Sequence, residues 1–211
     1  MSDEPTGLRE TKKRETRQLI SDRATRLFIA QGFEATTIAE IATAARVAKK
    51  TVTNYFPRKE DMALDHQDAF AGSLAAAVAG RAPGQSALAA LREAFAADAA
   101  ARNPVAGFAG PDFARMVHES PTLSARLRAL HDRREAALAD ALADATGAPP
   151  GDITARTAAA LLAAATRVLF DRVQELTLAG APGDEIARTV SAEADRAFAL
   201  LEPALGDYAV A

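Results

Sequence analysis

The chain has 211 residues, no cysteine and a formal net charge of -3. This length can bury a core without covalent staples, and the lack of cysteine excludes a disulfide scaffold, thiolate metal sites and a cysteine nucleophile. The charge is uneven, because residues 1–60 hold twelve Lys or Arg against eight Asp or Glu, whereas residues 61–211 hold thirteen against twenty. This asymmetry predicts a polyanionic partner for the first part only.

The first residues of the chain are almost wholly polar. We expect no signal peptide, and the longest apolar tract, 158–165, is too short to cross a bilayer. A cytoplasmic protein without a membrane segment is therefore expected. Residues 1–11 are predicted to form a flexible N-terminal arm. It either solubilises the chain or adds phosphate contacts through nearby cations, namely Arg9, Lys12, Lys13 and Arg14.

Helical periodicity runs along the whole chain and predicts an all-α fold of about nine helices. Residues 12–32 carry an apolar face that ends at Gly32 and is made of Ile20, Ala24, Leu27 and Phe28. The spacing of Thr37 and Glu40 is that of a capping box, which predicts a second helix from Thr37. A third helix is expected over 49–55, before Pro57. Further helices are predicted over 58–79, 85–101, about 111–118, 121–146, 152–179 and 184–201.

The predicted third helix has two chemically different faces. Val52 and the following Phe56 point to the core, whereas Lys49, Lys50, Thr53 and Asn54 offer groups that bind base edges. Hydroxyl and ammonium groups suited to phosphate oxygens come from Thr51, Tyr55 and Lys59. A short turn before such a helix is typical of helix-turn-helix proteins, in which this helix enters the major groove of DNA.

The run 33-FEATTIAEIATAARVAKKTVTNYFPRKEDMAL-64 resembles the DNA-binding domain of TetR-family transcriptional regulators. The shared features are Gly32-Phe33, Thr36-Thr37, Ile41-Ala42, Thr51, Tyr55-Phe56 and Lys59-Glu60. The resemblance implies a helix-turn-helix DNA-binding domain over 12–57 and a helical ligand-binding and dimerisation domain over 58–211. It also implies a homodimeric repressor that binds a near-palindromic DNA operator and is released by a small molecule. The residues expected at DNA are Thr36, Thr37, Arg46, Lys49, Lys50, Thr51, Thr53, Asn54, Tyr55 and Lys59.

The chain departs from the family pattern in the turn. Arg46 stands where the family usually has glycine, and Ala48 stands where it usually has a capping serine or threonine. Each change is expected to cost about 1 kcal/mol. Lys50 and Thr53 also replace frequent family residues. We expect an altered sequence preference and a looser turn.

The second domain carries fewer signals. Its sparse large side chains give the candidates for a ligand pocket, namely Phe70, Phe95, Phe108, Phe113, Met116, Arg167 and Phe170, with Arg115, His118 and Arg172 as further polar candidates. Residues 115–144 are similar to C-terminal domains of the mycofactocin-regulator type, which implies a hydrophobic or acyl effector. The last two long helices, rich in Ala and Leu, are predicted to form the homodimer interface.

Other function classes find little support. His66, His118 and His131 fall on different predicted helices without metal-ligand spacing, so we expect no metal. No nucleophile elbow, phosphate loop or dinucleotide fingerprint occurs, so we expect neither an enzyme nor a cofactor. The alternative that stays open is a helical protein–protein adaptor that has lost DNA binding.

Overall fold

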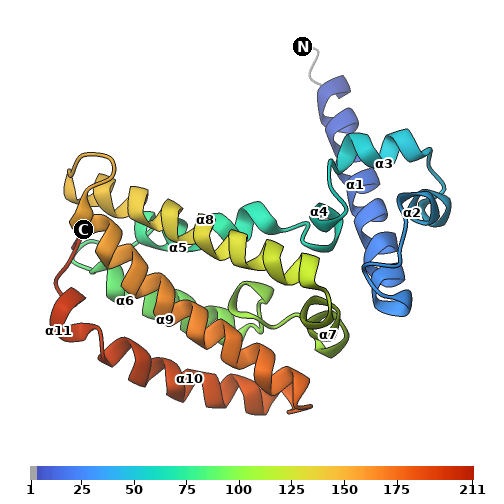
Figure 1. Cartoon of the computed structure of the whole chain (residues 1–211). Coiled ribbons are helices and arrows are strands. Elements are labelled where there is room, and N and C mark those ends of the chain that lie inside the picture. The colour runs from blue at the N-terminus through green and yellow to red at the C-terminus, as the bar shows by residue number, and fades with distance from the viewer. Residues whose placement is uncertain (1–3) are drawn as a thin grey trace. The chain divides into compact units, whose positions relative to one another are not determined.

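The computed structural model describes residues 4–211, so the expectation for residues 1–3 of the arm lies outside it. All regular elements of this part are helical (Figure 1). The all-α fold class is thus confirmed. The elements are α1 (Glu4–Gln31), α2 (Ile38–Ala45), α3 (Lys49–Tyr55), α4 (Glu60–Ala63), α5 (Gln67–Ala79), α6 (Ala87–Ala100), the 3₁₀ helix η1 (Pro104–Ala106), α7 (Pro111–Glu119), α8 (Pro121–Thr146), α9 (Ile153–Leu178), α10 (Gly183–Ala199) and α11 (Glu202–Leu205).

The chain forms two compact units. Unit 1 consists of Met1–Gln67 and Met116–Arg126, and unit 2 consists of Asp68–Arg115 and Leu127–Ala211. Unit 1 thus contains the helix-turn-helix segment together with α4, the end of α7 and the first residues of α8. Because α8 is one uninterrupted helix, it supplies side chains to both units.

Unit 1 is built around a small apolar core. α1 packs against α2 and α4, and α2 packs against α3. The largest side chains in this core are almost completely buried, and Phe28 also packs on Phe33 with ring centroids 4.9 Å apart. The core members are Ile20, Phe28, Ile41, Val52, Phe56 and Met62. The face of α1 predicted from the spacing of its apolar residues is therefore the face that anchors α2 and α4.

The two ends of α2 differ in how they are capped. At the start of α2 the predicted capping box is confirmed, because the Thr37 hydroxyl accepts from the Glu40 backbone N–H (3.2 Å) and the Thr37 N–H donates to the Glu40 carboxylate (2.8 Å). At its end Arg46 adopts the left-handed conformation (φ 55°, ψ 41°) that glycine usually fills. Ahead of α3, Ala48 makes no side-chain cap. The α2–α3 turn therefore forms without glycine at its left-handed position and without a side-chain cap at the start of α3.

The uncapped start of α3 leads to a stability prediction. Replacing Ala48 with serine is expected to raise the free energy of unfolding by about 1 kcal/mol, because a serine oxygen can accept from an otherwise unpaired N–H of the first helical turn. The same substitution at exposed Ala44, inside α2, is the matched control and is expected to be neutral or mildly destabilising. Urea unfolding of the full chain measures both. Equal effects of the two substitutions would contradict the capping argument.

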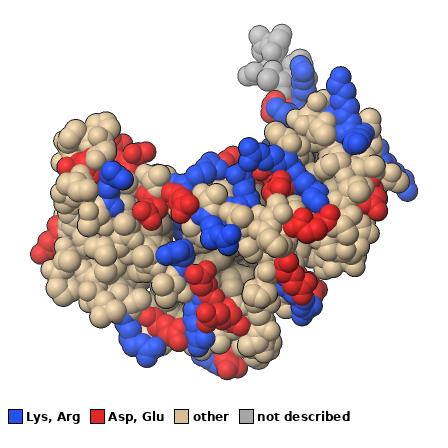
Figure 2. Space-filling view, viewed as in Figure 1, with Lys and Arg blue, Asp and Glu red and all other residues tan. Residues whose placement is uncertain are grey.

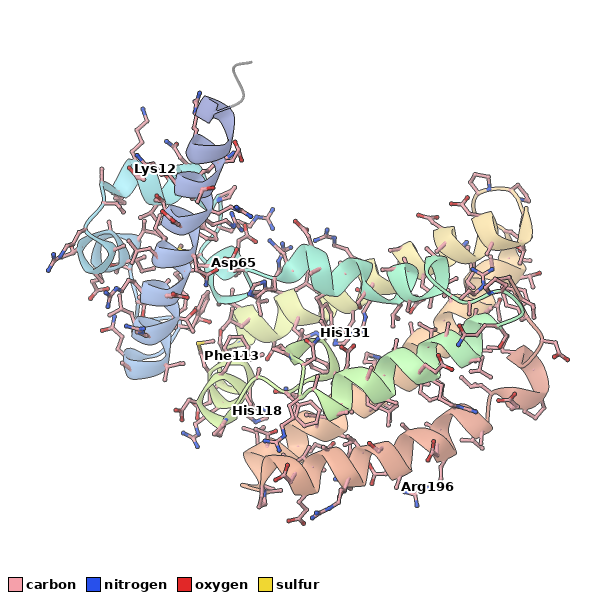
Figure 3. All side chains as sticks on the ribbon, turned by 180° about the vertical axis from the view of Figure 1, so that it is seen from behind. Lys12, Asp65, Phe113, His118, His131 and Arg196 are labelled. Atoms are coloured by element: carbon pink, nitrogen blue, oxygen red, sulfur yellow. The ribbon has the colours of Figure 1, made fainter. Side chains whose placement is uncertain are left out.

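Two predicted helix boundaries are wrong. α1 begins at Glu4 instead of residue 12, so the expected arm is helical from residue 4 onward; residues 8–15 are almost all Leu, Arg, Glu and Lys, which favour helix. The predicted helix 58–79 is broken at Leu64 (φ −111°, ψ 49°) into α4 and α5. Asp65, labelled in Figure 3, lies in this break and pairs with Arg17 of α1. A tertiary ion pair thus accompanies the end of α4.

Unit 2 has the larger core. α10 packs on α6 and α9, and η1 packs on the same two helices. Polar caps start two of these helices: Ser86 accepts from the Ala89 N–H, and Asp152 accepts from the N–H groups of Thr154 and Ala155. Core side chains come from α5, α6, η1, α8, α9, α10 and α11 and include Leu74, Val78, Leu88, Leu91, Leu138, Leu142, Leu162, Val173, Phe198 and Leu205.

Among the described residues, α9 is the one helix long and apolar enough to span a membrane. Its apolar character has another explanation, because Ala159, Leu162 and Val173 belong to the core of unit 2. The same helix carries the ionic side chains of Arg156, Arg167, Asp171 and Arg172. A core helix of a globular unit passes the same length and composition test, so we assign α9 to the core.

Candidate nucleic-acid interface

The exposed face of α3 is the centre of the candidate interface. Val52 is completely buried, and Phe56, which follows the helix, is 1% exposed. These two side chains anchor α3 to α1 and α2. The four residues predicted to read bases, Lys49, Lys50, Thr53 and Asn54, are all exposed. The apolar anchors therefore turn a row of polar and cationic groups outward.

This face offers several kinds of hydrogen-bonding group. Lys50 and Asn54 are four residues apart and lie on the same side of the helix. The lysine ammonium suits guanine O6 and N7, and the amide suits adenine N6 and N7. The Thr53 hydroxyl donates to the Lys50 carbonyl within α3 (3.1 Å), so its oxygen remains able to accept. The combination matches the edges of base pairs in a major groove.

Arg17 of α1 holds the end of α3 and was missed by sequence reasoning. Its guanidinium donates to the Tyr55 carbonyl (2.9 Å), pairs with Asp65, and lies 4.2 Å from the centre of the Phe56 ring. A cation at a helix C-terminus is favourable because the last carbonyls carry partial negative charge. Helical spacing could have indicated this role, because Arg17 precedes the buried Ile20 by three residues and therefore lies on the same face of α1.

Thr36 does not belong to the exposed interface. Its side chain is 2% exposed, and its hydroxyl donates to the Gly32 carbonyl (2.8 Å) and accepts from the Gln31 amide (3.2 Å). The prediction that Thr36 contacts DNA is therefore wrong, because these bonds fasten the α1–α2 loop. Thr37 is exposed, although its hydroxyl takes part in the capping box.

Lys59 also has a different environment from the one predicted. Its ammonium group donates to the carbonyls of Phe33 (2.7 Å), Thr36 (3.1 Å) and Glu34 (3.4 Å), and lies 4.2 Å from the centre of the Phe33 ring. An ammonium group has three N–H donors, and three protein acceptors engage them. Lys59 thus clamps the loop between α1 and α2, which leaves no N–H for a DNA phosphate.

The remaining predicted contacts surround α3. Thr51 and Tyr55 are half-buried, and Arg46 is exposed in the turn. On α1, Lys12, Lys13 and Arg14 are exposed. Figure 2 shows Lys and Arg side chains over the part of unit 1 near the start of α1 and α3, and Figure 3 labels Lys12. This distribution surrounds the polar face of α3 with cations.

The start of α8 is fastened to the helix-turn-helix segment within unit 1. The Ser120 hydroxyl donates to the Glu34 carboxylate (2.7 Å) and lowers the pKa of that carboxyl. Arg126 pairs with the buried Asp61 (3.1 Å) and also donates to the Gln67 side chain. From this contact α8 continues as one helix into unit 2.

The predicted ligand residues fall into separate groups. In unit 2, Phe70 and Phe170 are buried and pack against each other with centroids 5.8 Å apart, with the His131 ring 5.1 Å from each. Phe95 is buried beside Phe198, and Arg167 is exposed on α9. Phe108 and Phe113 are half-buried in unit 2, whereas Met116 is buried in unit 1. The predicted set therefore does not form one pocket wall.

Within the described part of the chain, no group of three or more His, Asp or Glu side chains is placed to hold a metal ion. The imidazoles of His118 and His131 lie in different units.

Comparison with known proteins agrees with this geometry. A family model described as "Bacterial regulatory proteins, tetR family" matches residues 20–65. The HTH-type transcriptional regulator TcmR of Streptomyces glaucescens is 40% identical over 91 residues. That alignment covers 43% of this chain and 40% of TcmR, so the chain matches less than half the length of this curated relative.

Two solved structures extend the likeness to nearly the whole chain. GusR of Salmonella enterica superposes with a TM-score of 0.55 at 20% identity and covers 91% of this chain and 96% of its own. The fatty acid degradation regulator FadR of Bacillus halodurans has a TM-score of 0.53 at 18% identity, with coverages of 90% and 96%. At these identities the likeness establishes the fold. The helix-turn-helix segment over residues 20–65 thus matches the tetR family of bacterial regulatory proteins, and the rest of the chain shares the all-helical fold of the solved structures.

Proposed function

We propose that this protein is a cytoplasmic, homodimeric transcriptional repressor that binds a near-palindromic DNA operator and is released by a small molecule. The observation that carries the proposal is the division of α3 into a buried anchor, Val52, and an exposed face with Lys50 and Asn54. The match of residues 20–65 to the tetR family model supports DNA binding as the use of that face. The basic surroundings of α3 support it further, because cations supply most of the affinity for a phosphate backbone.

A two-fold dimer follows from the geometry of operator binding. Helix-turn-helix dimers place two recognition helices in half-sites about 34–36 Å apart or at multiples of that distance. α9 has a suitable surface for pairing, because Leu161 is 42% exposed and Val168 is 62% exposed on the same helix face, with exposed Ala164 between them. The exposed side chains of α10 are mostly charged, so we assign the larger apolar contribution to α9.

Replacing Val168 with glutamate is expected to shift the protein from dimer to monomer, because a carboxylate would be buried at the centre of the paired faces. Val210, 46% exposed near the C-terminus, provides the matched control, and V210E is expected to stay dimeric. Sedimentation velocity at several concentrations measures both variants. A dimer unaffected by V168E would refute this interface. A surface variant is preferable to truncation, because α9 and α10 also supply the core of unit 2.

DNA binding can be tested with the full chain and a labelled duplex from the upstream region of its own gene. Affinity is expected to fall steeply with salt, by roughly a thousandfold between 50 and 200 mM if six or more phosphates are contacted. A duplex of the same composition in scrambled order should bind more weakly. Absence of salt-sensitive binding would favour the adaptor alternative instead.

Release by a ligand requires only that the ligand binds one of two conformations more tightly than the other. The coupling free energy between two such binding sites is typically about 1–3 kcal/mol. The continuity of α8 supports a mechanical route. Its Ser120 flank and Arg126 contact the DNA-binding unit, whereas its later turns, including His131, line the interior of unit 2. A ligand that displaces α8 in unit 2 would therefore strain the contacts to Glu34 and Asp61.

A further inference from the structure

Arg134 of α8 is a buried cation without an ionic partner. Its side chain is 6% exposed, its Nε donates to the Ser73 hydroxyl (2.8 Å), and its guanidinium lies 4.6 Å from the centre of the Phe70 ring. Among the described residues, no carboxylate forms a salt bridge with it. In the part of the chain that the structure describes, the guanidinium makes a single hydrogen bond, which is the one from Nε. Two terminal nitrogens thus remain available.

The charge on Arg134 persists despite burial. Burial lowers the pKa of this guanidinium to about 10, so the group stays protonated near neutral pH. Asp98 is the nearest compensating charge, but its carboxylate accepts from the Asn103 amide (2.9 Å), and burial raises its pKa. A buried charge is costly unless it is paired and hydrogen-bonded. The interior of unit 2 is therefore electrostatically suited to an added anion.

Two cavities meet at Arg134. The inner one, of about 20 Å³, is lined by Ser73, Asp98 and Thr166 and has room for about one water molecule. The outer one, of about 100 Å³, is lined by His131 of α8 and by Ala163 and Arg167 of α9. This outer volume exceeds that of a single water molecule and has room for the carboxylate group of a ligand. Arg134 lines both cavities.

The ring of His131 forms part of the wall of the outer cavity. Its Nε2 atom is buried without a hydrogen-bond partner among the described residues, and its ring packs edge-on against Phe70 and Phe170. Burial, followed by the charges of Arg134 and Arg167, lowers the pKa of His131 to about 4. The imidazole is therefore neutral near pH 7 and adds no charge to the cavity wall. Figure 3 shows His131 among the helices of unit 2.

We propose that the outer cavity binds the carboxylate of an acidic effector, with Arg134 and Arg167 pairing its charge and the His131 ring forming part of the wall. Arginine forks recognise carboxylates by two parallel hydrogen bonds, which suits the free terminal nitrogens of Arg134. Asp132 and Glu135 also line this cavity and disfavour a doubly charged phosphate. This inference rests on the proposed ligand-responsive function and names the chemical class of its effector.

The same helix connects this cavity to the DNA-binding unit. Arg134 lies about two helical turns beyond Arg126, whose guanidinium pairs with Asp61 in unit 1. A carboxylate that attracts Arg134 and Arg167 would draw α8 and α9 together at this level. The inference therefore assigns to α8 both the recognition of the effector and the transmission of its effect.

Calorimetric titration of the full chain with benzoate tests the site, with benzamide as its neutral analogue and inorganic phosphate as a second anion. Benzoate is expected to bind, and benzamide at least about tenfold more weakly, because the amide has no charge to pair with the arginines. Phosphate is also expected to bind at least about tenfold more weakly, because its second negative charge meets Asp132 and Glu135. R167M, at an exposed position where folding is not at risk, is expected to weaken benzoate about tenfold. R134M should weaken benzoate binding more strongly than R167M does. R128M, at an exposed position of α8, is the control and should leave the benzoate affinity unchanged.

Equal binding of benzoate and benzamide, tighter binding of phosphate, undetectable benzoate binding, or an unchanged benzoate affinity in R167M would each overturn the proposed site. Binding of the ligand-free protein to its operator is measured separately. Operator binding without benzoate binding refutes the effector class alone. Benzoate binding without operator binding refutes the proposed repressor function and leaves the carboxylate site standing.

Discussion

Alanine at Asn54 or at Lys50 is expected to weaken operator binding by about 1–3 kcal/mol for each lost base contact, or roughly 5- to 150-fold. Both side chains are exposed on α3, so neither substitution removes core packing. The free energy of unfolding should therefore stay within about 0.5 kcal/mol of wild type. Binding to unrelated DNA should change little for Asn54→Ala, since an amide carries no charge. Lys50→Ala should also lose part of the nonspecific affinity.

Fluorescence anisotropy with operator and scrambled duplexes measures these changes. Arg188→Ala provides the control, because Arg188 is an exposed cation on α10 in unit 2. That variant removes a positive charge far along the chain from α3 and should retain wild-type operator affinity. If Asn54→Ala and Lys50→Ala bound the operator as tightly as Arg188→Ala does, the assignment of α3 as the reading helix would be wrong.

The second large effect is expected at Lys59. Replacement by methionine removes three hydrogen bonds from an ammonium group to loop carbonyls and a cation–π contact with Phe33. We expect the stability of unit 1 to fall by about 2–4 kcal/mol, since bonds to charged groups contribute more than neutral ones. Operator affinity should fall only to the extent that unit 1 unfolds, and its salt dependence should keep the wild-type slope.

Arg58 is the matched control for this prediction, because it is the preceding residue, is exposed and carries the same charge. Urea unfolding followed by circular dichroism, together with salt titrations of operator binding, compares R58M with K59M. A phosphate contact by Lys59 would give the opposite pattern. Stability would then be unchanged and the slope of log affinity against log salt would drop by about 0.9.

Local signals explain why much of unit 1 was predictable. The bounds of α3 and the capping box of α2 depend on residues within a few positions of each other, as do the starts of α8 at Pro121 and of α9 after Asp152. The alternation of buried Val52 with exposed Lys50 and Asn54 follows from helical spacing alone. Sequence therefore sufficed to predict which face of α3 points outward.

Long-range contacts explain what sequence did not show. Thr36 and Lys59 look like surface polar residues, but one binds the Gly32 carbonyl and the other reaches back over Phe33. The break at Leu64 coincides with the Arg17–Asp65 pair, whose members lie far apart in sequence. In each case the function of the residue depends on a contact partner elsewhere in the fold, and the residue type alone does not identify that partner.

The site in unit 2 was less predictable still. Large side chains were the only signal for a ligand pocket, and they do not lie together: Phe70 packs on Phe170 in unit 2, whereas Met116 is buried in unit 1. Arg134 was overlooked although a signal existed. It stands between Leu130 and Leu138 at intervals of four residues, so it interrupts the buried stripe of α8. A cation in an apolar stripe is buried, and its partner must come from elsewhere.

Protection of the operator from dimethyl sulfate tests the central claim, which is that the exposed face of α3 lies in the major groove. The reagent methylates guanine N7 in the major groove and adenine N3 in the minor groove. We expect guanine N7 protection in two clusters, separated by about 34–36 Å or a multiple of that distance, while adenine N3 between them stays reactive. A bound operator with adenine N3 protected and guanine N7 fully reactive would contradict the account.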